Sequence, residues 1–145
     1  MHPEDWHADE AWDENLDRDV AHLKMKQDAG AHYVVDQMIF DAGLHFRFVK
    51  EAREDGVTIP IIPGILAFEK YTQAARFVGP DLHILMPRAL QSALQGASEE
   101  DQTRIALDHM AEQVRKLLKG GVPGIHFYCM NRAGPTIELL RRAAL

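Results

Sequence analysis

The feature that most constrains the fold is a set of three short apolar runs separated by helical patterns. The runs cover residues 32–40, 58–66 and 124–131, and each is a nearly continuous mixture of β-branched, aromatic and aliphatic side chains. Such runs are typical of parallel strands that are buried on both faces. Because strands that alternate with helices favour βαβ units, the sequence predicts an α/β fold with three parallel strands.

The segments around these runs have the periodicity and the end signals of helices. Gly30 and Gly56 follow two of the patterns and suit the residue after a helix C-terminus. Ser98 and Asp101 resemble a capping box at the start of a long pattern. The expected helices cover residues 17–29, 44–55, 69–78 and 98–119, with a last one that has Pro135 in its first turn.

Length and charge limit the classes of protein that fit. A chain of 145 residues forms one compact domain at most. Residues 1–19 hold eight acidic side chains and one basic one, which leaves 14 acidic and 15 basic residues of the totals of 22 and 16. We therefore expect a solvated acidic loop over residues 1–16, and the nearly neutral remainder has no basic stripe for nucleic acid.

The sequence also argues against membrane and disulfide classes. No apolar run is long enough to cross a bilayer, so we expect a cytoplasmic protein. The single cysteine, Cys129, excludes an internal disulfide and is expected in the core. No HExxH or paired-ligand spacing occurs among the eight histidines, so no metal site is predicted.

Three strands are too few for a closed barrel, and an open three-stranded sheet would expose a hydrogen-bonding edge on each side. The sequence therefore suggests a partial structure. Five segments together carry a family resemblance: HPE, KMKQDAGAHYVVDQMIFD, IPIIPGIL, KYTQAARF and GVPGIHFYCMNRA, at residues 2–4, 24–41, 59–66, 70–77 and 121–133. Through them the chain resembles the methylenetetrahydrofolate reductase family, in register from about residue 17 to the C-terminus.

The resemblance implies a partial (β/α)₈ TIM barrel, with residues 1–145 as the C-terminal half of the barrel domain. It implies a flavoprotein oxidoreductase that uses NADH or NADPH and FAD to reduce 5,10-methylenetetrahydrofolate to 5-methyltetrahydrofolate, in one-carbon metabolism and methionine biosynthesis. The family's general acid and the residues that hold the flavin ring match no segment of this chain. We therefore expect the isolated chain to be inactive and to bind FAD weakly at most.

Two other interpretations stay open. One is a non-catalytic half-barrel subunit that pairs with a complementing N-terminal half or forms a homo-oligomer through its open edges. The other is a reading frame that starts late in a longer enzyme. Both interpretations keep the same fold class and the same family, and neither implies a nucleic-acid or membrane partner.

The resemblance assigns four residues to FAD: His2, Asp19, His22 and Lys26. Asp19, His22 and Lys26 are spaced i, i+3 and i+7, which places them on one helix face. A lysine suits a diphosphate and a carboxylate suits ribose hydroxyls. The alternatives are a frayed terminus for His2 and a solvated polar face for the other three.

The resemblance also assigns Gln37, Gln73, Phe77 and Arg132 to substrate binding. Gln37 would hydrogen-bond the pterin and the nicotinamide in turn, and we expect it to be buried in its strand. Gln73 and Phe77 are expected on one helix face, toward the nicotinamide nucleotide and a stacked ring. Arg132 follows the last strand and suits an anionic group. The alternatives are a core glutamine, a core phenylalanine and a surface ion pair.

Overall fold

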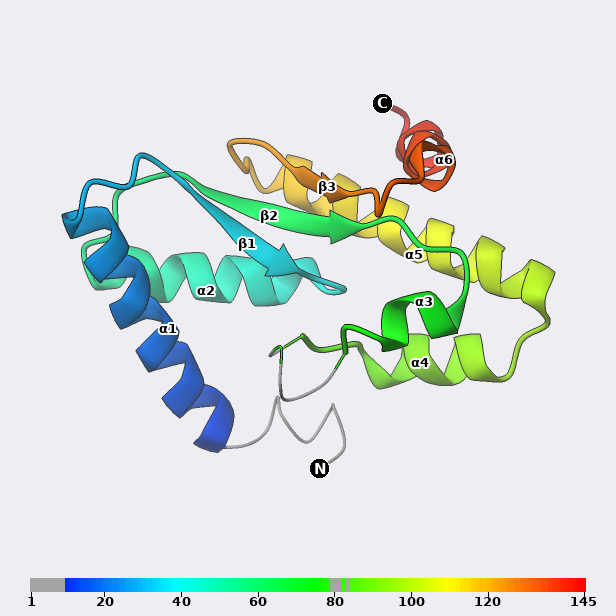
Figure 1. Cartoon of the computed structure of the whole chain (residues 1–145), viewed down its shortest axis with the longest axis horizontal. Helices are drawn as coiled ribbons and strands as arrows, with labels where there is room; N and C mark the ends of the chain where they lie inside the picture. Colours follow the sequence, from blue (N-terminus) through cyan, green and yellow to red (C-terminus); the bar gives the residue numbers. More distant parts are fainter. Residues whose placement is uncertain (1–9, 79–81, 83) are drawn as a thin grey trace.

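The structure, a computed structural model, describes residues 10–78, 82 and 84–145. It contains one parallel sheet in the order β1-β2-β3, formed by Val34–Met38, Ile61–Leu66 and His126–Tyr128 (Figure 1). Each strand lies inside one of the three predicted ranges, so the prediction of an α/β fold with three parallel strands is confirmed.

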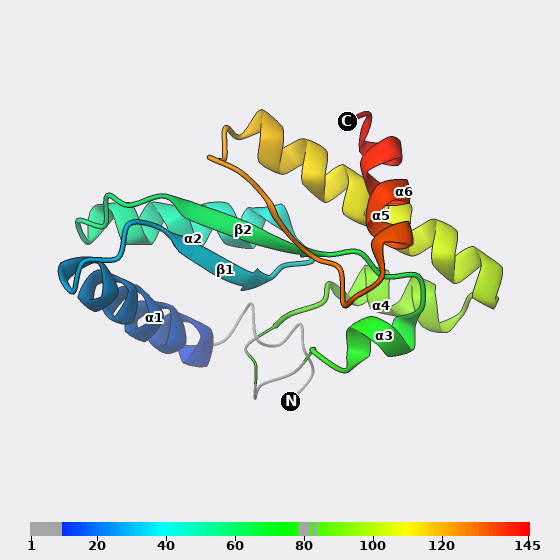
Figure 2. The ribbon, with the colours of Figure 1, turned by 45° about the horizontal axis from the view of Figure 1, so that its top comes forward.

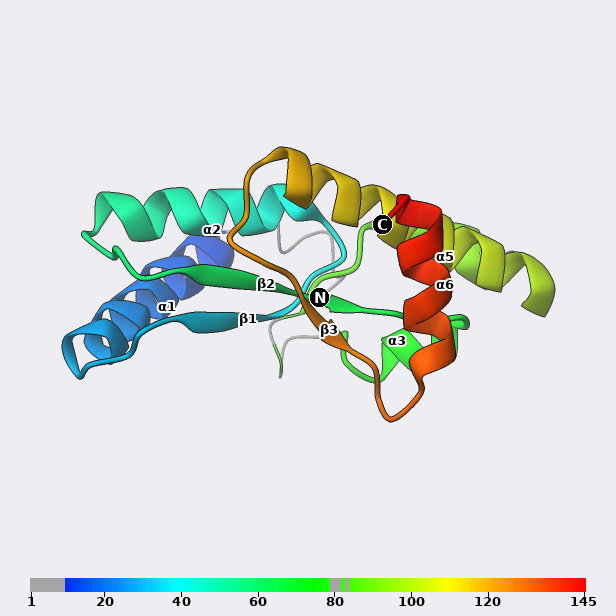
Figure 3. The same ribbon diagram turned by 90° about the horizontal axis from the view of Figure 1, so that it is seen from above.

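Helices alternate with these strands and also fill the long connection from β2 to β3. Figure 3 shows α2 and α5 along the same side of the sheet, with α6 packed against α5. The helices are α1 (Glu10–Asp28), α2 (Ala42–Glu54), α3 (Tyr71–Ala75), α4 (Arg88–Gln95), α5 (Glu99–Lys119) and α6 (Ala133–Ala143).

The helix ends bear out most of the predicted signals. Gly30 and Gly56 both have positive φ, 100° and 84°, a conformation that glycine adopts without strain. Ser98 caps α5, since its side chain accepts from the Asp101 N–H at 3.2 Å and donates to the Asp101 carboxylate at 2.9 Å. The predicted long helix and its cap are therefore confirmed.

Two predicted boundaries are wrong. The loop expected over residues 1–16 is helical from Glu10, because the burial of Leu16 packs this part of the helix against the fold. The helix expected over residues 69–78 ends at Ala75, so Phe77 lies beyond it. The Phe77 N–H donates to the Ala74 carbonyl at 2.9 Å, in a tight turn that ends the helix.

The prediction that all strands are buried on both faces holds only for β2. In β1 the partly exposed and exposed residues alternate from Val34 to Gln37, and His126 of β3 is exposed. The physical reason is position, because β1 and β3 are the outer strands of the sheet. Cys129, expected in the core, is only half-buried, and its sulfur accepts from the Thr136 hydroxyl at 3.3 Å.

The apolar core consists of two clusters. The larger one joins the sheet to α5 and α6 and includes Phe40, Ile65, Met110 and Leu139. The smaller one holds α1 against α2 and the start of β2, through Leu16, Val20, Leu23, Ala52, Val57 and Ile61. Across residues 10–78, 82 and 84–145, no helix is long and apolar enough to cross a membrane.

Candidate functional site

A cavity of about 340 Å³ lies between α1, β1 and the first half of α2. Figure 2 shows α1 beneath β1, and the cavity opens between these two elements. Its polar lining consists of Asp19, His22, Lys26, Asp36, Gln37 and His45. Its apolar lining consists of Leu16, Leu23, Val34, Val35, Met38, Ile39, Leu44, Phe48, Leu82 and Leu85.

The α1 wall brings together three of the predicted cofactor residues. Asp19, His22 and Lys26 all line the cavity, so the prediction that they share a helix face is confirmed. Leu23, which is 3% exposed, anchors this face in the smaller apolar cluster. Lys26 lies in the last turn of α1, where the helix dipole favours a positive charge. His2, the fourth predicted residue, lies outside the described part of the chain.

The β1 wall is irregular at the point where it meets the cavity. Val35 is opposite Ile62 and Met38 is opposite Gly64, so two residues of β1 face one residue of β2. This is a β-bulge, a feature that redirects side chains. Gln37 lies in the bulge, lines the cavity and is exposed, so the expectation that it is buried in the strand is wrong.

The buried His45 and the half-buried Asp36 form a pair beside Gln37 that the sequence reasoning missed. The His45 ring nitrogen Nδ1 lies 3.1 Å from the Asp36 oxygen Oδ2, and His45 is only 2% exposed. The other Asp36 oxygen, Oδ1, accepts from the Gln37 N–H at 2.8 Å. The sequence does contain a signal for this pair, because Asp36 and His45 each interrupt an apolar pattern. Since buried polar groups need partners, each of them was a candidate for a paired polar residue.

Tyr128 connects this wall to the far strand of the sheet. Its hydroxyl donates to the Asp36 carbonyl at 3.3 Å, across the intervening strand β2. Burial raises the pKa of the Tyr128 hydroxyl above its usual range, and the nearby Asp36 carboxylate adds to the rise. The hydroxyl therefore stays protonated and able to donate at physiological pH.

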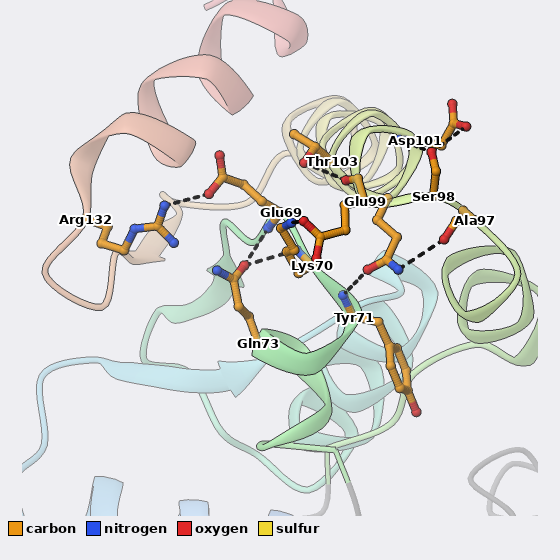
Figure 4. Close-up of polar contacts among 11 residues, drawn as sticks. Glu69, Lys70, Tyr71, Gln73, Ala97, Ser98, Glu99, Asp101, Thr103 and Arg132 are labelled. Carbon is orange, nitrogen blue, oxygen red and sulfur yellow. Dashed lines mark hydrogen bonds and ion pairs between the residues drawn. The ribbon is translucent and has the colours of Figure 1, made fainter.

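Gln73 and Arg132 follow the carboxyl ends of β2 and β3 (Figure 4), and neither of them nor Phe77 lines this cavity. Arg132 donates to the Glu69 carboxylate at 2.7 Å. Gln73 caps α3, since its Oε1 accepts from the N–H groups of Glu69 and Lys70 at 2.8 and 3.1 Å. Phe77 packs against the larger apolar cluster. The Arg132 ion pair and the packing of Phe77 are the contacts expected under the alternatives for these two residues, whereas the cap formed by Gln73 was not among the alternatives.

Helix α5 fixes the loops that follow β1 and β2. Gln113, which is buried, accepts from the Ala42 N–H at 3.0 Å, and His109 Nε2 lies 2.7 Å from the Phe40 carbonyl oxygen. After β2, Lys70 pairs with Glu99, and the hydrogen bond and charge of Lys70 lower the Glu99 pKa (Figure 4). One helix thus holds the segments that follow β1 and β2, both at the carboxyl end of the parallel sheet.

No group of three or more potential metal ligands lies together in the described ranges, 10–78, 82 and 84–145. The arrangement that remains is a cavity with one cation, two carboxylates, two imidazoles and a carboxamide on apolar walls. Such a surface suits a small organic ligand that carries both charged and apolar parts.

Comparison with known proteins identifies the family. The family model described as Methylenetetrahydrofolate reductase matches residues 1–144. The chain is 35% identical over 130 residues to a Caenorhabditis elegans protein named "Probable methylenetetrahydrofolate reductase (NADPH)", covering 88% of this chain and 20% of that one. It is 33% identical over 147 residues to "Methylenetetrahydrofolate reductase (NADH) 1" of Arabidopsis thaliana, covering 99% and 25%.

A bacterial relative gives a similar result. The "5,10-methylenetetrahydrofolate reductase" of Escherichia coli K12 is 32% identical over 117 residues, covering 79% of this chain and 39% of the relative. The chain thus spans 20% to 39% of the length of these three relatives. The family that the sequence motifs predicted is confirmed, and the chain belongs to the methylenetetrahydrofolate reductase family.

Proposed function

We propose that this chain supplies part of the binding site of a flavin-dependent reductase, which reduces 5,10-methylenetetrahydrofolate to 5-methyltetrahydrofolate with NADH or NADPH. The observation that carries the proposal is the convergence of Asp19, His22 and Lys26 from α1 and Gln37 from β1 on one cavity. Family membership and the names of the relatives, which specify NADPH or NADH, support the reaction and the reductant.

The cavity suits one portion of FAD. Lys26 offers a point charge for a diphosphate, and Asp19 can accept from ribose hydroxyls. The volume of about 340 Å³ is near the lower end of the roughly 300–1,000 Å³ of small-molecule sites, so we propose that it takes one portion of the cofactor. FAD, when bound, would supply the hydride relay between the nicotinamide and the folate.

Gln37 is the proposed contact for the reacting rings. Its Oε1 accepts from the Met38 N–H at 3.0 Å, which leaves the Nε2 protons and the second Oε1 lone pair to offer a ligand. A carboxamide of this kind can serve both the pterin and the nicotinamide. Gln73 and Phe77 are proposed on the nucleotide side, and Arg132 would reach an anionic group by exchanging its ion pair with Glu69.

We also propose that the three strands are part of a (β/α)₈ barrel. Support comes from the parallel order of the sheet and from its two outer strands, β1 and β3, each of which presents an edge that another strand could extend. The same edges favour the second candidate function, a half-barrel subunit that pairs with a complementing N-terminal half. In either case the general acid would come from outside this chain.

Binding of FAD and of riboflavin, measured by equilibrium dialysis, tests the cofactor assignment. Riboflavin lacks the diphosphate that Lys26 is proposed to contact. Lys26→Ala should weaken FAD binding roughly tenfold, because a hydrogen bond to a charged group contributes about 1.5–3 kcal/mol, and should leave riboflavin binding unchanged. Lys24→Ala is the matched control, since Lys24 lies on the same helix, pairs with Asp28 and does not line the cavity.

Equal losses for FAD and riboflavin, or an equal effect of Lys24→Ala, would contradict the role of Lys26.

The half-barrel is tested by co-expressing this chain with the N-terminal part of the Escherichia coli relative. Recovery of bound flavin and of NADH oxidation in the mixed assembly, with neither part active alone, is the expected result. Reductase activity of the isolated chain would overturn the proposal that it lacks the acid.

A further inference from the structure

We infer that Asp36, held by the buried ring of His45, is a positioning residue that fixes the β1 bulge and thereby directs Gln37 toward the cavity. The importance of Gln37 rests on the proposed function. The positioning itself is a property of the ligand-free chain, so it can be tested separately.

The bulge is the first support for this inference. Asp36 and Gln37 together face Pro63 of β2, because the residues on either side are in register as Val35 with Ile62 and Met38 with Gly64. The register shifts at this point, so the regular ladder does not continue through Asp36 and Gln37. Other contacts therefore have to determine the backbone path of β1 here.

Three hydrogen bonds on Asp36 supply those contacts. The carboxylate oxygen Oδ1 accepts from the Gln37 N–H at 2.8 Å, and Oδ2 lies 3.1 Å from His45 Nδ1 of α2. The carbonyl oxygen accepts from the Tyr128 hydroxyl of β3 at 3.3 Å. Residues of β1, α2 and β3 thus hold one residue, and the first of these bonds acts directly on Gln37.

The burial of His45 points to a geometric role for the pair. His45 is 2% exposed and the Asp36 side chain is 22% exposed. Burying a polar ring costs stability unless it is paired, and an apolar side chain would fill the same volume at lower cost. The histidine is therefore better explained by what it holds in place than by its contribution to the core.

Both members of the pair line the same cavity as Gln37. A displaced Asp36 carboxylate would release the Gln37 N–H and allow β1 to change the direction of its side chains, since successive residues of a strand point to opposite faces. The pair thus determines which face of the sheet presents the Gln37 carboxamide.

The test is NMR of the ¹⁵N-labelled, ligand-free chain and its variants. In Asp36→Ala the Gln37 backbone N–H should exchange with solvent roughly tenfold faster, because it loses a bond to a charged acceptor. The Gln37 side-chain amide should lose its nuclear Overhauser contacts with the cavity lining. In Asp36→Asn, which keeps one acceptor oxygen, the exchange rate of the Gln37 N–H should lie between those of Asp36→Ala and the parent chain.

Asp41→Ala is the matched control. Asp41 is the N-cap of α2, with its side chain accepting from the Gly43 N–H at 2.9 Å, and it does not line the cavity. Its loss should reduce stability and leave the Gln37 signals in place. Unchanged Gln37 signals in folded Asp36→Ala, or an equal disturbance in Asp41→Ala, would overturn the inference.

A second variant keeps the inference testable if Asp36→Ala does not fold. His45→Phe keeps an aromatic ring in the buried site and removes only the contact with Asp36. It should also accelerate exchange of the Gln37 N–H, and unchanged exchange would count against the inference. Titration of the parent chain with NADH then tests the proposed function separately. If Gln37 responds to Asp36 but not to NADH, the positioning stands and the ligand assignment fails.

Discussion

At the residue scale, Gly64 is the described glycine at which an added Cβ would meet backbone atoms most closely. It lies in β2 where β1 bulges on one side and Tyr128 crosses on the other. A Cβ at this position would lie 2.6 Å from the Tyr128 ring, 2.8 Å from the Asp36 carbonyl oxygen and 2.9 Å from that of Gln37. Two of these neighbours are backbone atoms, so the clash cannot be relieved by a side-chain movement alone.

Gly64→Ala should therefore destabilise the fold by about 1–3 kcal/mol, the usual cost of overpacking. Urea unfolding monitored by circular dichroism measures the change. Gly134→Ala is the control, because a Cβ added at Gly134, inside α6, would have no neighbour within 4 Å. An unchanged free energy of unfolding for Gly64→Ala would show that the sheet can move apart at this point.

At the scale of elements, α5 organises the site without lining the cavity. Its residues bond to the loop after β1 through Gln113 and to the loop after β2 through Glu99 and Gln102. The first turn of α5 contains Glu99, Glu100 and Asp101, which suit the positive end of the helix. A change at the α5 N-terminus should therefore reach the loop that carries Glu69.

Ser98→Ala removes the N-cap of α5 and should cost about 1 kcal/mol of stability. The measurement is thermal unfolding, together with hydrogen exchange of the loop after β2. Ser92→Ala, at an exposed position inside α4, should be neutral or slightly stabilising because alanine is the better helix former. Equal effects of the two variants would show that the cap contributes nothing specific.

At the scale of the whole molecule, the two apolar clusters support different parts of the site. The α1 wall of the cavity is held by the smaller cluster, whereas β2, α5 and α6 belong mainly to the larger one. Few buried contacts imply a low local stability, so α1 should open more readily than the rest of the fold. Any ligand that spans the cavity would bind α1 and β1 together and reduce this opening.

Hydrogen exchange measured by mass spectrometry should show faster exchange in α1 than in α5. Leu23→Ala should raise the exchange of α1 while α5 stays protected, since Leu23 belongs to the smaller cluster. Met110→Ala, in the larger cluster, should raise exchange throughout the chain. Uniform exchange in the parent chain and in both variants would mean that the two clusters unfold as one unit.

Local signals made much of this fold predictable. Gly30, Gly56 and Ser98 mark helix ends by conformational freedom and by capping, which depend on neighbours in the chain. The spacing of Asp19, His22 and Lys26 predicted a shared face for the same reason, and all three line the cavity. The burial of Gln37 was mispredicted, because an apolar run does not reveal which strand lies at the edge of a sheet.

The order of residues along the chain was enough to predict the family, the three parallel strands, most of the helices and the helix face that lines the cavity. The bulge at Gln37, the Asp36–His45 pair and the ion pair of Arg132 with Glu69 became visible only in the folded molecule. Capping and periodicity are local and can be read along the chain. A bulge or a partner 63 residues away depends on how separate elements pack, which no local pattern specifies.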